Sequence, residues 1–362
     1  MSLKHLSEYR DKELAQKLIA AIRDQSKRPI RLMEVCGTHT VSIFRHGIRQ
    51  VLPPTIQLIS GPGCPVCVTA TEEIDRAVKL ARNPGVMITT FGDLVRVPGS
   101  QSSLQMERAS GADVRMVYST FDALKLAREN QNKKVIFLAI GFETTAPTIA
   151  AAVLEAKLLG LENYFILSAH KLLPPALEVL LNSGDLNLHG FIYPGHVTTI
   201  IGTGAYEQVA EKYHLPGVVC GFEPVDILET ILMLVRQIEQ GQAKVEIQYK
   251  RGVSAIGNPK ALNVLNRVFV PCDAPWRGLG TIPDSGLALR PEFRAFAAED
   301  HFDLQVPPAQ DHPGCACGEV LRGIKTPLQC LLFRTACRPD SPIGPCMVST
   351  EGTCAAYFKY NE

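Results

Sequence analysis

The residues in this sequence that are most able to do chemistry are its cysteines. The chain of 362 residues contains 11 cysteines, an odd number. Six of them lie in the last 48 residues: Cys315, Cys317, Cys330, Cys337, Cys346 and Cys354. In a reducing compartment such clusters bind metals or carry out redox chemistry more often than they form a disulfide framework. Six buried thiols acting only as small apolar side chains are improbable over so short a stretch.

The spacing of the tail cysteines distinguishes between kinds of metal site. Structural zinc usually takes two close pairs of ligands, whereas the gaps after Cys317 are twelve, six, eight and seven residues. Iron–sulfur clusters accept wider spacing, because four thiolates can reach the cluster from separate loops. The tail therefore favours a 4Fe-4S cluster and leaves zinc as an alternative.

A second cysteine motif, Cys64-Pro65-Val66-Cys67, follows an expected strand and the turn Gly61-Pro62-Gly63. Alone, such a pair is either a redox dithiol or half of a zinc site. The following Thr69–Glu72 segment fits a capping box that opens a helix, and a helix N-terminus lowers the pKa of nearby thiols. We therefore expect a redox-active pair, with a tight turn holding two buried thiols as the alternative.

Cys36 and His39 form a third candidate. Cys36 ends the expected strand Ile30–Val35, and a helix capped by Thr38 should begin there and stabilise a thiolate. His39 is close enough in sequence to be a second ligand, a proton donor or a hydrogen-bond partner of the sulfur. Without a nucleophile-elbow context, the pair alone does not define a catalytic site.

The elements that position these residues are expected to be alternating strands and helices. Short Val- and Ile-rich runs alternate with amphipathic segments from about residue 29 to 220, which is typical of parallel α/β sheets. The predicted strands are residues 30–35, 56–60, 86–90, 114–118, 135–140, 165–168, 190–193 and 217–220. Apolar residues at helical spacing predict helices through residues 41–51, 74–81 and 149–156.

Each expected strand runs into a turn with polar or glycine residues, and such turns converge at the carboxyl edge of open α/β sheets. Further candidates to line this edge are Glu143, Thr144, Thr145, His170, His196 and Glu223, and of these Glu143, Thr144, Thr145 and His196 are the candidates to bind a cofactor. For any one of them, an ordinary helix cap is the alternative. No glycine-rich turn matches the dinucleotide or Walker patterns, so nucleotide binding has no motif support.

The predicted fold class is α/β, with two parallel-sheet lobes that face each other across a cleft and an irregular C-terminal iron–sulfur domain. We expect the first lobe to span residues 1–125 and contain Cys36 and the Cys64/Cys67 pair. The second lobe should span residues 126–254. Frequent prolines and scarce helical periodicity mark residues 255–362 as the irregular domain.

Composition excludes several classes of function. With 37 basic and 36 acidic residues, the chain shows no charge footprint for nucleic acid. Its apolar runs are far shorter than the ~20 residues of a membrane span, and its start has no apolar signal core. We expect a cytoplasmic protein that binds neither nucleic acid nor membrane.

Several longer motifs carry a family resemblance from about residue 30 to the C-terminus. They are Met33–Thr40 (MEVCGTHT), Gly61–Cys67 (GPGCPVC), Gly141–Thr145 (GFETT), Pro194–Val197 (PGHV) and Gly344–Tyr357 (GPCMVSTEGTCAAY). The sequence resembles the HypD family of hydrogenase maturation proteins. Small departures are Thr38 and Thr40, where more variable residues are usual, and Thr198, where serine is usual.

The resemblance implies an assembly scaffold for the Fe(CN)2CO centre of NiFe hydrogenases. In that family the iron is thought to be held together with the small partner HypC, and cyanide is delivered by HypE. Carried over by position, Cys36 would be the iron-binding or partner-contacting thiolate, His39 its neighbour, and Cys64 with Cys67 the redox dithiol. Such a chain would be mainly a scaffold with redox activity rather than a stand-alone enzyme.

The resemblance also implies a set of cluster ligands. The family's four ligands are separated by fourteen, six and sixteen residues, which maps them onto Cys315, Cys330, Cys337 and Cys354. Cys317 is a possible substitute for Cys315, and Cys346 would not be a ligand. The main alternative is a cluster-dependent disulfide reductase acting through Cys64 and Cys67, and a zinc-stabilised α/β binding protein is a third possibility.

Overall fold

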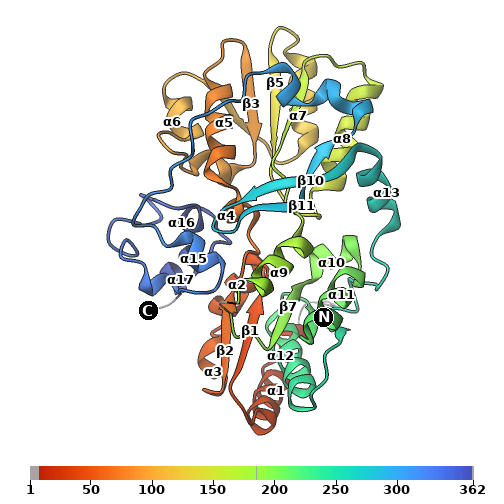
Figure 1. Cartoon of the computed structure of the whole chain (residues 1–362), viewed down its shortest axis with the longest axis vertical. Helices are drawn as coiled ribbons and strands as arrows, with labels where there is room; N and C mark the ends of the chain where they lie inside the picture. Colours follow the sequence, from red (N-terminus) through yellow and green to blue (C-terminus); the bar gives the residue numbers. More distant parts are fainter. Residues whose placement is uncertain (1–7, 185, 361–362) are drawn as a thin grey trace.

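A computed structural model describes residues 8–184 and 186–360 and contains two parallel α/β lobes, one above the other in Figure 1. The five-stranded sheet of the first lobe has the order β2-β1-β7-β8-β9, and the four-stranded sheet of the second lobe has the order β4-β3-β5-β6. All pairings within these two sheets are parallel. The predicted α/β class with two lobes is confirmed.

The first lobe lies at the bottom of Figure 1. Its strands are β1 (Ile30–Glu34), β2 (Ile56–Ser60), β7 (Gly190–Pro194), β8 (Gly217–Cys220) and β9 (Val245–Ile247). Its helices are η1 (Glu8–Arg10), α1 (Lys12–Gln25), α2 (Gly37–Arg45), α3 (Ile48–Val51), α9 (Leu173–Asn182), α10 (Gly195–Ile201), α11 (Gly204–Tyr213) and α12 (Pro224–Glu239). Apolar side chains of α1 and α12 form one core with the sheet, and those of α9 and α11 form another.

The second lobe is built from the middle of the chain. Its strands are β3 (Val86–Thr90), β4 (Asp113–Met116), β5 (Lys134–Ala139) and β6 (Tyr164–Ser168). Its helices are α5 (Thr71–Ala81), η2 (Gly92–Arg96), α6 (Leu104–Ala109), α7 (Thr120–Glu129) and α8 (Ala146–Leu158). The short helix α4 (Pro65–Val68) connects the two lobes.

All eight predicted strands form, with ends that differ by two residues at most. The helical pattern through residues 41–51 is divided between α2 and α3, because Gly47 adopts a positive φ of 63° that an α-helix does not accommodate. Strand β9, with three partly exposed residues, has too little apolar pattern to be recognised from sequence.

The sheets do not divide the chain at the expected boundary between residues 125 and 126. Strands β3 and β4 precede this point but share a sheet with β5 and β6, and the chain then returns to the first lobe for β7. Parallel strands look alike in sequence because both faces are buried. Their apolar runs therefore identified strands without showing which sheet each would join.

Residues 255–302 are more regular than expected. Helix α13 (Pro259–Val268) leads into the antiparallel hairpin of β10 (Phe269–Trp276) and β11 (Gly280–Leu289), followed by η3 (Pro291–Phe296) and α14 (Ala298–His301). Phe269, Leu287 and Phe296 share a core with Phe137 of the second lobe. Prolines interrupt helical periodicity here, but Pro271 and Pro275 lie within a two-stranded ribbon, where both strands are edges.

The irregular domain begins only after about residue 302, and an extended segment leads from the second lobe to the C-terminal helices (Figure 1). These short elements are α15 (Cys317–Leu321), η4 (Pro327–Gln329), α16 (Pro345–Val348) and α17 (Thr353–Tyr360). None of the described helices combines the length and apolar character that a bilayer crossing requires. The start of the chain, where no signal core was expected, falls largely in residues 1–7, outside the described residues.

Candidate functional site

The strand order defines where a ligand site belongs in each lobe. In the first sheet the chain moves from β1 outward to β2 in one direction and from β7 outward to β8 in the other, so the switch point lies between β1 and β7. Cys36 follows β1, and His196 follows β7. Their side chains meet across this switch point, with Cys36 Sγ 3.9 Å from His196 Nδ1. Ligands of open α/β sheets bind at such positions.

The second sheet has its own switch point between β3 and β5. Asp93 follows β3 in η2, and Glu143 follows β5 in the turn before α8. The Oε1 atom of Glu143 accepts a hydrogen bond of 2.8 Å from the backbone N–H of Leu173, the first residue of α9. Glu143 of the second lobe therefore hydrogen-bonds to helix α9 of the first lobe. The position of Glu143 in the sequence did not indicate this contact between the lobes.

Cys36 is almost entirely buried and is the N-cap residue of α2. Burial raises the pKa of its thiol to about 12, and this effect exceeds the opposing hydrogen bonds from the backbone of His39 and Thr38. The expectation of a thiolate stabilised by the helix end is therefore wrong for the metal-free chain. Thr38 is not the N-cap, because α2 already begins at Gly37.

His39 has a different position from the one expected. Its Nε2 atom lies 2.9 Å from the carbonyl oxygen of Gly221, and its ring stacks on Phe222 at a centroid distance of 4.9 Å. Burial lowers the pKa of His39 to about 4, so the ring is neutral and Nε2–H donates to this carbonyl. His39 thus supports the loop after β8, and the imidazole beside the Cys36 sulfur is that of His196.

His196 is also neutral, because burial lowers its pKa to about 4. Phe222 lies between the two histidines, with its ring 5.3 Å from that of His196. The Cys36 thiol thus has an uncharged imidazole beside it. Once its proton is lost, the sulfur is a soft ligand that favours a softer metal.

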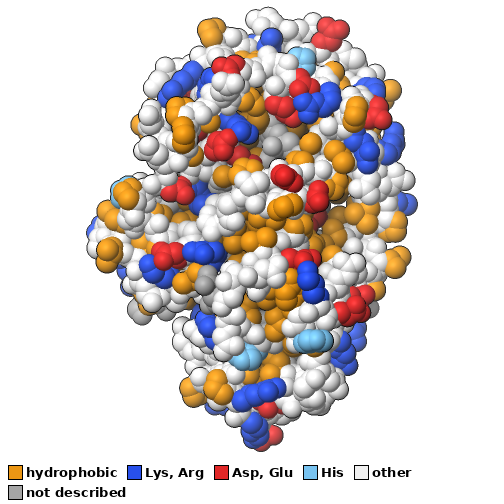
Figure 2. Space-filling model, viewed as in Figure 1, with side chains coloured by type: hydrophobic (Ala, Val, Ile, Leu, Met, Phe, Trp, Pro, Cys, Tyr) orange, Lys and Arg blue, Asp and Glu red, His pale blue; other side chains and the backbone are white. Residues whose placement is uncertain are grey.

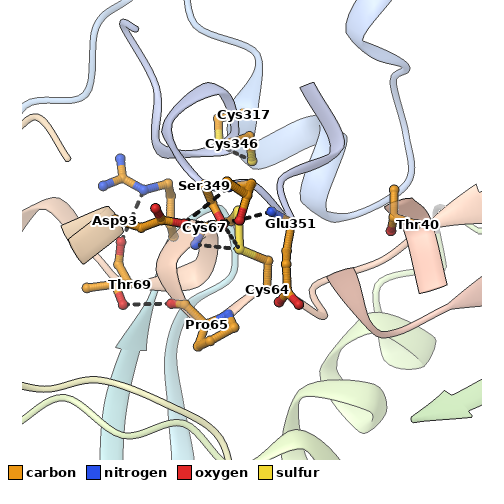
Figure 3. The surroundings of a disulfide bond; sticks show 12 residues. Thr40, Cys64, Pro65, Cys67, Thr69, Asp93, Cys317, Cys346, Ser349 and Glu351 are labelled. Atoms are coloured by element: carbon orange, nitrogen blue, oxygen red, sulfur yellow. Dashed lines mark hydrogen bonds between the residues drawn. A yellow bond between two sulfur atoms is a disulfide. The ribbon is translucent and has the colours of Figure 1, made fainter. Parts of the chain in front are cut away.

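Cys64 and Cys67 are joined by a disulfide, with Cα atoms 5.2 Å apart (Figure 3). Cys64 is the N-cap of α4, and its Sγ accepts a hydrogen bond of 3.3 Å from the N–H of Cys67. Both sulfurs are buried in an apolar cluster. The expected capping box lies elsewhere: Glu73, not Glu72, accepts from the N–H of Ala70 at 3.0 Å, where α5 begins.

A turn from the C-terminal domain, Ser349–Glu351, lies beside the disulfide and Asp93 (Figure 3) and also contacts α2. Ser349 Oγ lies 3.3 Å from Cys64 Sγ, and the N–H of Thr350 donates to Asp93 Oδ2 at 3.2 Å. The Thr38 hydroxyl donates to Glu351 Oε1 at 2.6 Å. The resemblance included this segment, but its role as a connector was missed, since contacts over so many residues leave no local pattern in sequence.

Two glycines permit the close packing around Cys36. A Cβ atom on Gly37 would lie only 2.6 Å from Cβ of Glu351, and one on Gly63 would overlap the backbone of Cys36. The backbones of α2, the Gly61–Gly63 turn and the C-terminal turn can therefore approach one another without side chains between them. This packing places the Cys36 segment directly against the turn that precedes the disulfide.

The six tail cysteines line one small cavity in the C-terminal domain. They come from different segments: Cys315 and Cys317 at the start of α15, Cys330 after η4, Cys337 in a turn, Cys346 in α16 and Cys354 in α17. Cys317 Sγ and Cys346 Sγ are 2.9 Å apart. Hydrogen bonds from the thiols of Cys315 and Cys346 lower the pKa of Cys317 well below its usual range.

The donor set of this cavity fits an iron–sulfur cluster, which needs four thiolates that can approach from separate loops. Among residues 8–184 and 186–360, no group of three His, Cys, Asp or Glu side chains is arranged to hold a single metal ion. Cys317 and Cys346 belong to the same apolar cluster as Cys64 and Cys67. The cysteine cavity and the disulfide are therefore neighbours.

Of the remaining candidates, Glu223 lines a surface pocket with Phe222, Tyr249 and Arg251, whereas Glu143 and His170 do not reach the surface. Glu143 and His170 are buried, whereas Thr144 and Thr145 are partly exposed at the start of α8. Burial raises the pKa of Glu143 to about 7, and its Oε2 atom has no hydrogen-bond partner among the described residues. His170 contacts Ser168 Oγ at 3.1 Å, and Glu223 pairs with Arg10 at the surface. Glu143 is thus a buried carboxyl whose contact with the first lobe is the N–H of Leu173.

The fold and this site define a two-lobed α/β protein with cysteines placed after strands and in a cysteine-rich C-terminal domain. Comparison with known proteins agrees with that class. The HypD family model, described as "Hydrogenase formation hypA family", matches residues 13–361. The chain belongs to the HypD family of hydrogenase maturation factors.

Three relatives illustrate the similarity. The chain is 46% identical to the hydrogenase maturation factor HypD2 of Bradyrhizobium diazoefficiens, over 99% of this chain and 97% of that protein. It is 45% identical to the hydrogenase maturation factor HypD of Escherichia coli, over 99% of each chain. It is 46% identical to a putative hydrogenase expression/formation protein of Methanocaldococcus jannaschii, over 97% of this chain and 98% of that protein. The predicted family is confirmed.

Proposed function

We propose that this maturation factor is a cytoplasmic scaffold on which the Fe(CN)2CO centre of NiFe hydrogenases is assembled. The iron is cargo rather than a resident cofactor. Cys36 is its ligand on this chain, the N-terminal cysteine of a HypC-type partner is a second ligand, and a HypE-type protein delivers cyanide. The position of Cys36 at the switch point of the first sheet, beside His196, supports this assignment.

The chemistry of Cys36 follows from its surroundings. The thiol is protonated in the metal-free chain, because burial raises its pKa to about 12. A bound cation removes that proton, since metal coordination deprotonates a thiol. The ring of His196, whose Nδ1 lies 3.9 Å from the sulfur, is neutral because burial lowers its pKa to about 4. Iron binding at Cys36 is therefore coupled to loss of the thiol proton.

Cys64 and Cys67 supply the redox chemistry of the scaffold. Two electrons and two protons convert their disulfide to two thiols, and the reverse reaction returns the electrons. Cys315, Cys330, Cys337 and Cys354 would hold a 4Fe-4S cluster, which supplies single electrons when bound. Cys317 is the alternative to Cys315 as a ligand, because hydrogen bonds from Cys315 and Cys346 lower its pKa and favour its thiolate.

The observation that carries the proposal is the Ser349–Glu351 turn. It contacts Cys64 through Ser349 and Thr38 of α2 through Glu351, two residues after the Cys36 N-cap. The alternative of a disulfide reductase is disfavoured, because Cys64 and Cys67 are only 4% and 0% exposed. A disulfide in another protein could not approach sulfurs that are covered in this way.

Iron binding tests the scaffold against the reductase. The anaerobic chain is incubated with ferrous iron and the HypC-type partner, and iron in the isolated complex is compared with iron in the chain alone. A scaffold gains iron in the complex, and Cys36→Ala prevents this gain without changing the iron of the chain alone. Absence of any gain with the unmodified chain would favour the reductase.

A further inference from the structure

Arg277 is the only arginine among the described residues that is buried, with 6% of its surface exposed. It follows β10, and its backbone N–H donates to the carbonyl oxygen of Val68 at 2.9 Å. Its Nε atom donates to the carbonyl oxygen of Thr69 at 3.1 Å. Val68 is the last residue of α4, the short helix that contains Cys67. The guanidinium is therefore anchored to the backbone just after the disulfide.

The next residue of this loop, Gly278, packs against the start of the cysteine-rich domain. A Cβ atom on Gly278 would lie only 2.4 Å from Cα of Gly318, the residue after Cys317. Hydrogen bonds from the thiols of Cys315 and Cys346 lower the pKa of Cys317, and the positive charge of the guanidinium lowers it further. The guanidinium is thus close to both the disulfide helix and the cysteine cavity.

The charge and the hydrogen-bond donors of Arg277 are only partly compensated. Its Nη1 atom pairs with Asp311, whose side chain is 56% exposed, so this carboxylate interacts mainly with water and offsets only part of the buried charge. The Nη2 atom is buried and has no hydrogen-bond partner among the described residues, and such donors are rare in folded proteins. On the face shown in Figure 2, exposed basic and acidic side chains are interspersed. Solvent screens those charges, whereas a buried cation acts strongly on a charge nearby.

We propose that Arg277 raises the reduction potential of the tail cluster, with Nη2 as a donor to a sulfur of the cluster or of its ligands. The inference rests on the proposed function, in which the tail cysteines hold a cluster. Reduction adds one negative charge, and a buried cation stabilises the reduced form more than the oxidised form. Hydrogen bonds to sulfur also tune the potential of such clusters. Arg277 therefore makes the cluster easier to reduce.

The test is a redox titration of the anaerobic, cluster-loaded chain followed by electron paramagnetic resonance. Dithionite gives one electron to each cluster and is itself oxidised to sulfite. Arg277→Gln should make the cluster about tenfold harder to reduce, which lowers the midpoint of a one-electron couple by about 59 mV. Arg277→Lys keeps the charge and should restore most of the midpoint. Arg82→Gln is the control for loss of one arginine charge, because Arg82 pairs with Glu107 in the second lobe, and it should leave the midpoint unchanged.

Asp311→Asn provides a test of opposite sign, which a purely structural role of Arg277 would not produce. Without its carboxylate partner the buried charge is less compensated, so the midpoint should rise. Equal midpoints for the unmodified chain and Arg277→Gln would overturn the proposal. If Arg277→Gln does not retain iron and sulfide, Asp311→Asn decides, and a midpoint that stays the same or falls overturns the proposal. Absence of the signal of a reduced 4Fe-4S cluster in the unmodified chain would instead overturn the proposed function itself.

Discussion

Ser349 places its hydroxyl oxygen 3.3 Å from the Sγ atom of Cys64, although 285 residues separate them in the sequence. The next residues of the same turn bind Asp93 and Thr38. One short segment of the C-terminal domain therefore contacts the disulfide, the second lobe and the helix that begins after Cys36. A change in this turn should influence both lobes.

Removal of the Glu351 carboxylate should destabilise the chain. Glu351→Ala leaves the Thr38 hydroxyl without its 2.6 Å acceptor, and a hydrogen bond to a charged group contributes about 1.5–3 kcal/mol. We expect a loss in that range in anaerobic urea unfolding. Glu319→Ala is the control, because its ion pair with Lys325 is partly exposed and worth less. Equal losses in the two variants would contradict the connecting role of Glu351.

Replacement of a tail ligand should remove the cluster. Cys337→Ala or Cys354→Ala leaves three of the four assigned thiolates, so anaerobic protein should lose most of its iron and acid-labile sulfide. Stability should also fall, because a metal group anchors a domain with little regular structure. Cys272→Ala is the control, since Cys272 lies in β10 and outside the cysteine cavity. Full iron and sulfide in either ligand variant would show that the ligand assignment is wrong.

The Cys64–Cys67 disulfide should form and break reversibly. After anaerobic reduction both cysteines should become labelled by a thiol reagent, and mild oxidation should link them to each other in mass spectra. Because both sulfurs are buried, labelling should be slow unless the chain is partly unfolded. Two thiols that stay separately labelled after every oxidation would exclude the redox role.

Glu143 should make stability depend on pH. Its pKa is about 7 in the folded chain against an ordinary value of 4.5, so the folded state holds a proton that the unfolded state releases between these values. The resulting stabilisation, about 3 kcal/mol, is fully present below pH 4.5 and is lost as pH rises through 7. Glu143→Gln should flatten the unfolding free energy over this window. An unchanged slope would contradict the assigned protonation.

Much of the fold could be read from sequence. Runs such as Val86–Thr90 and Val135–Ile140 identified strands because buried parallel strands are continuously apolar. Because strands of both sheets are continuously apolar, the sequence did not show to which sheet each run belongs. The return of the chain to the first lobe at β7 was therefore not predicted. The hairpin β10–β11 was missed because its prolines resembled those of an irregular segment.

The candidate site was only partly accessible from sequence. Cys36, Cys64 and Cys67 were recognised by residue type and by their place after strands. Sequence proximity suggested His39 as the neighbour of the Cys36 sulfur, but the switch point brings His196 there instead. Burial could not be judged from local pattern, so the high pKa of Cys36 was also not foreseen.

The central claim, that Cys36 holds the iron of the maturing centre, is tested most directly by infrared spectroscopy of the anaerobic complex with the HypC-type partner. Cys36→Ala should abolish the cyanide and carbon monoxide bands and hydrogenase maturation while the visible spectrum of the tail cluster is retained. Cys220→Ala is the matched control, because Cys220 is another buried thiol at a strand end, and it should keep the bands. Persistence of the bands with normal maturation in Cys36→Ala would contradict the account.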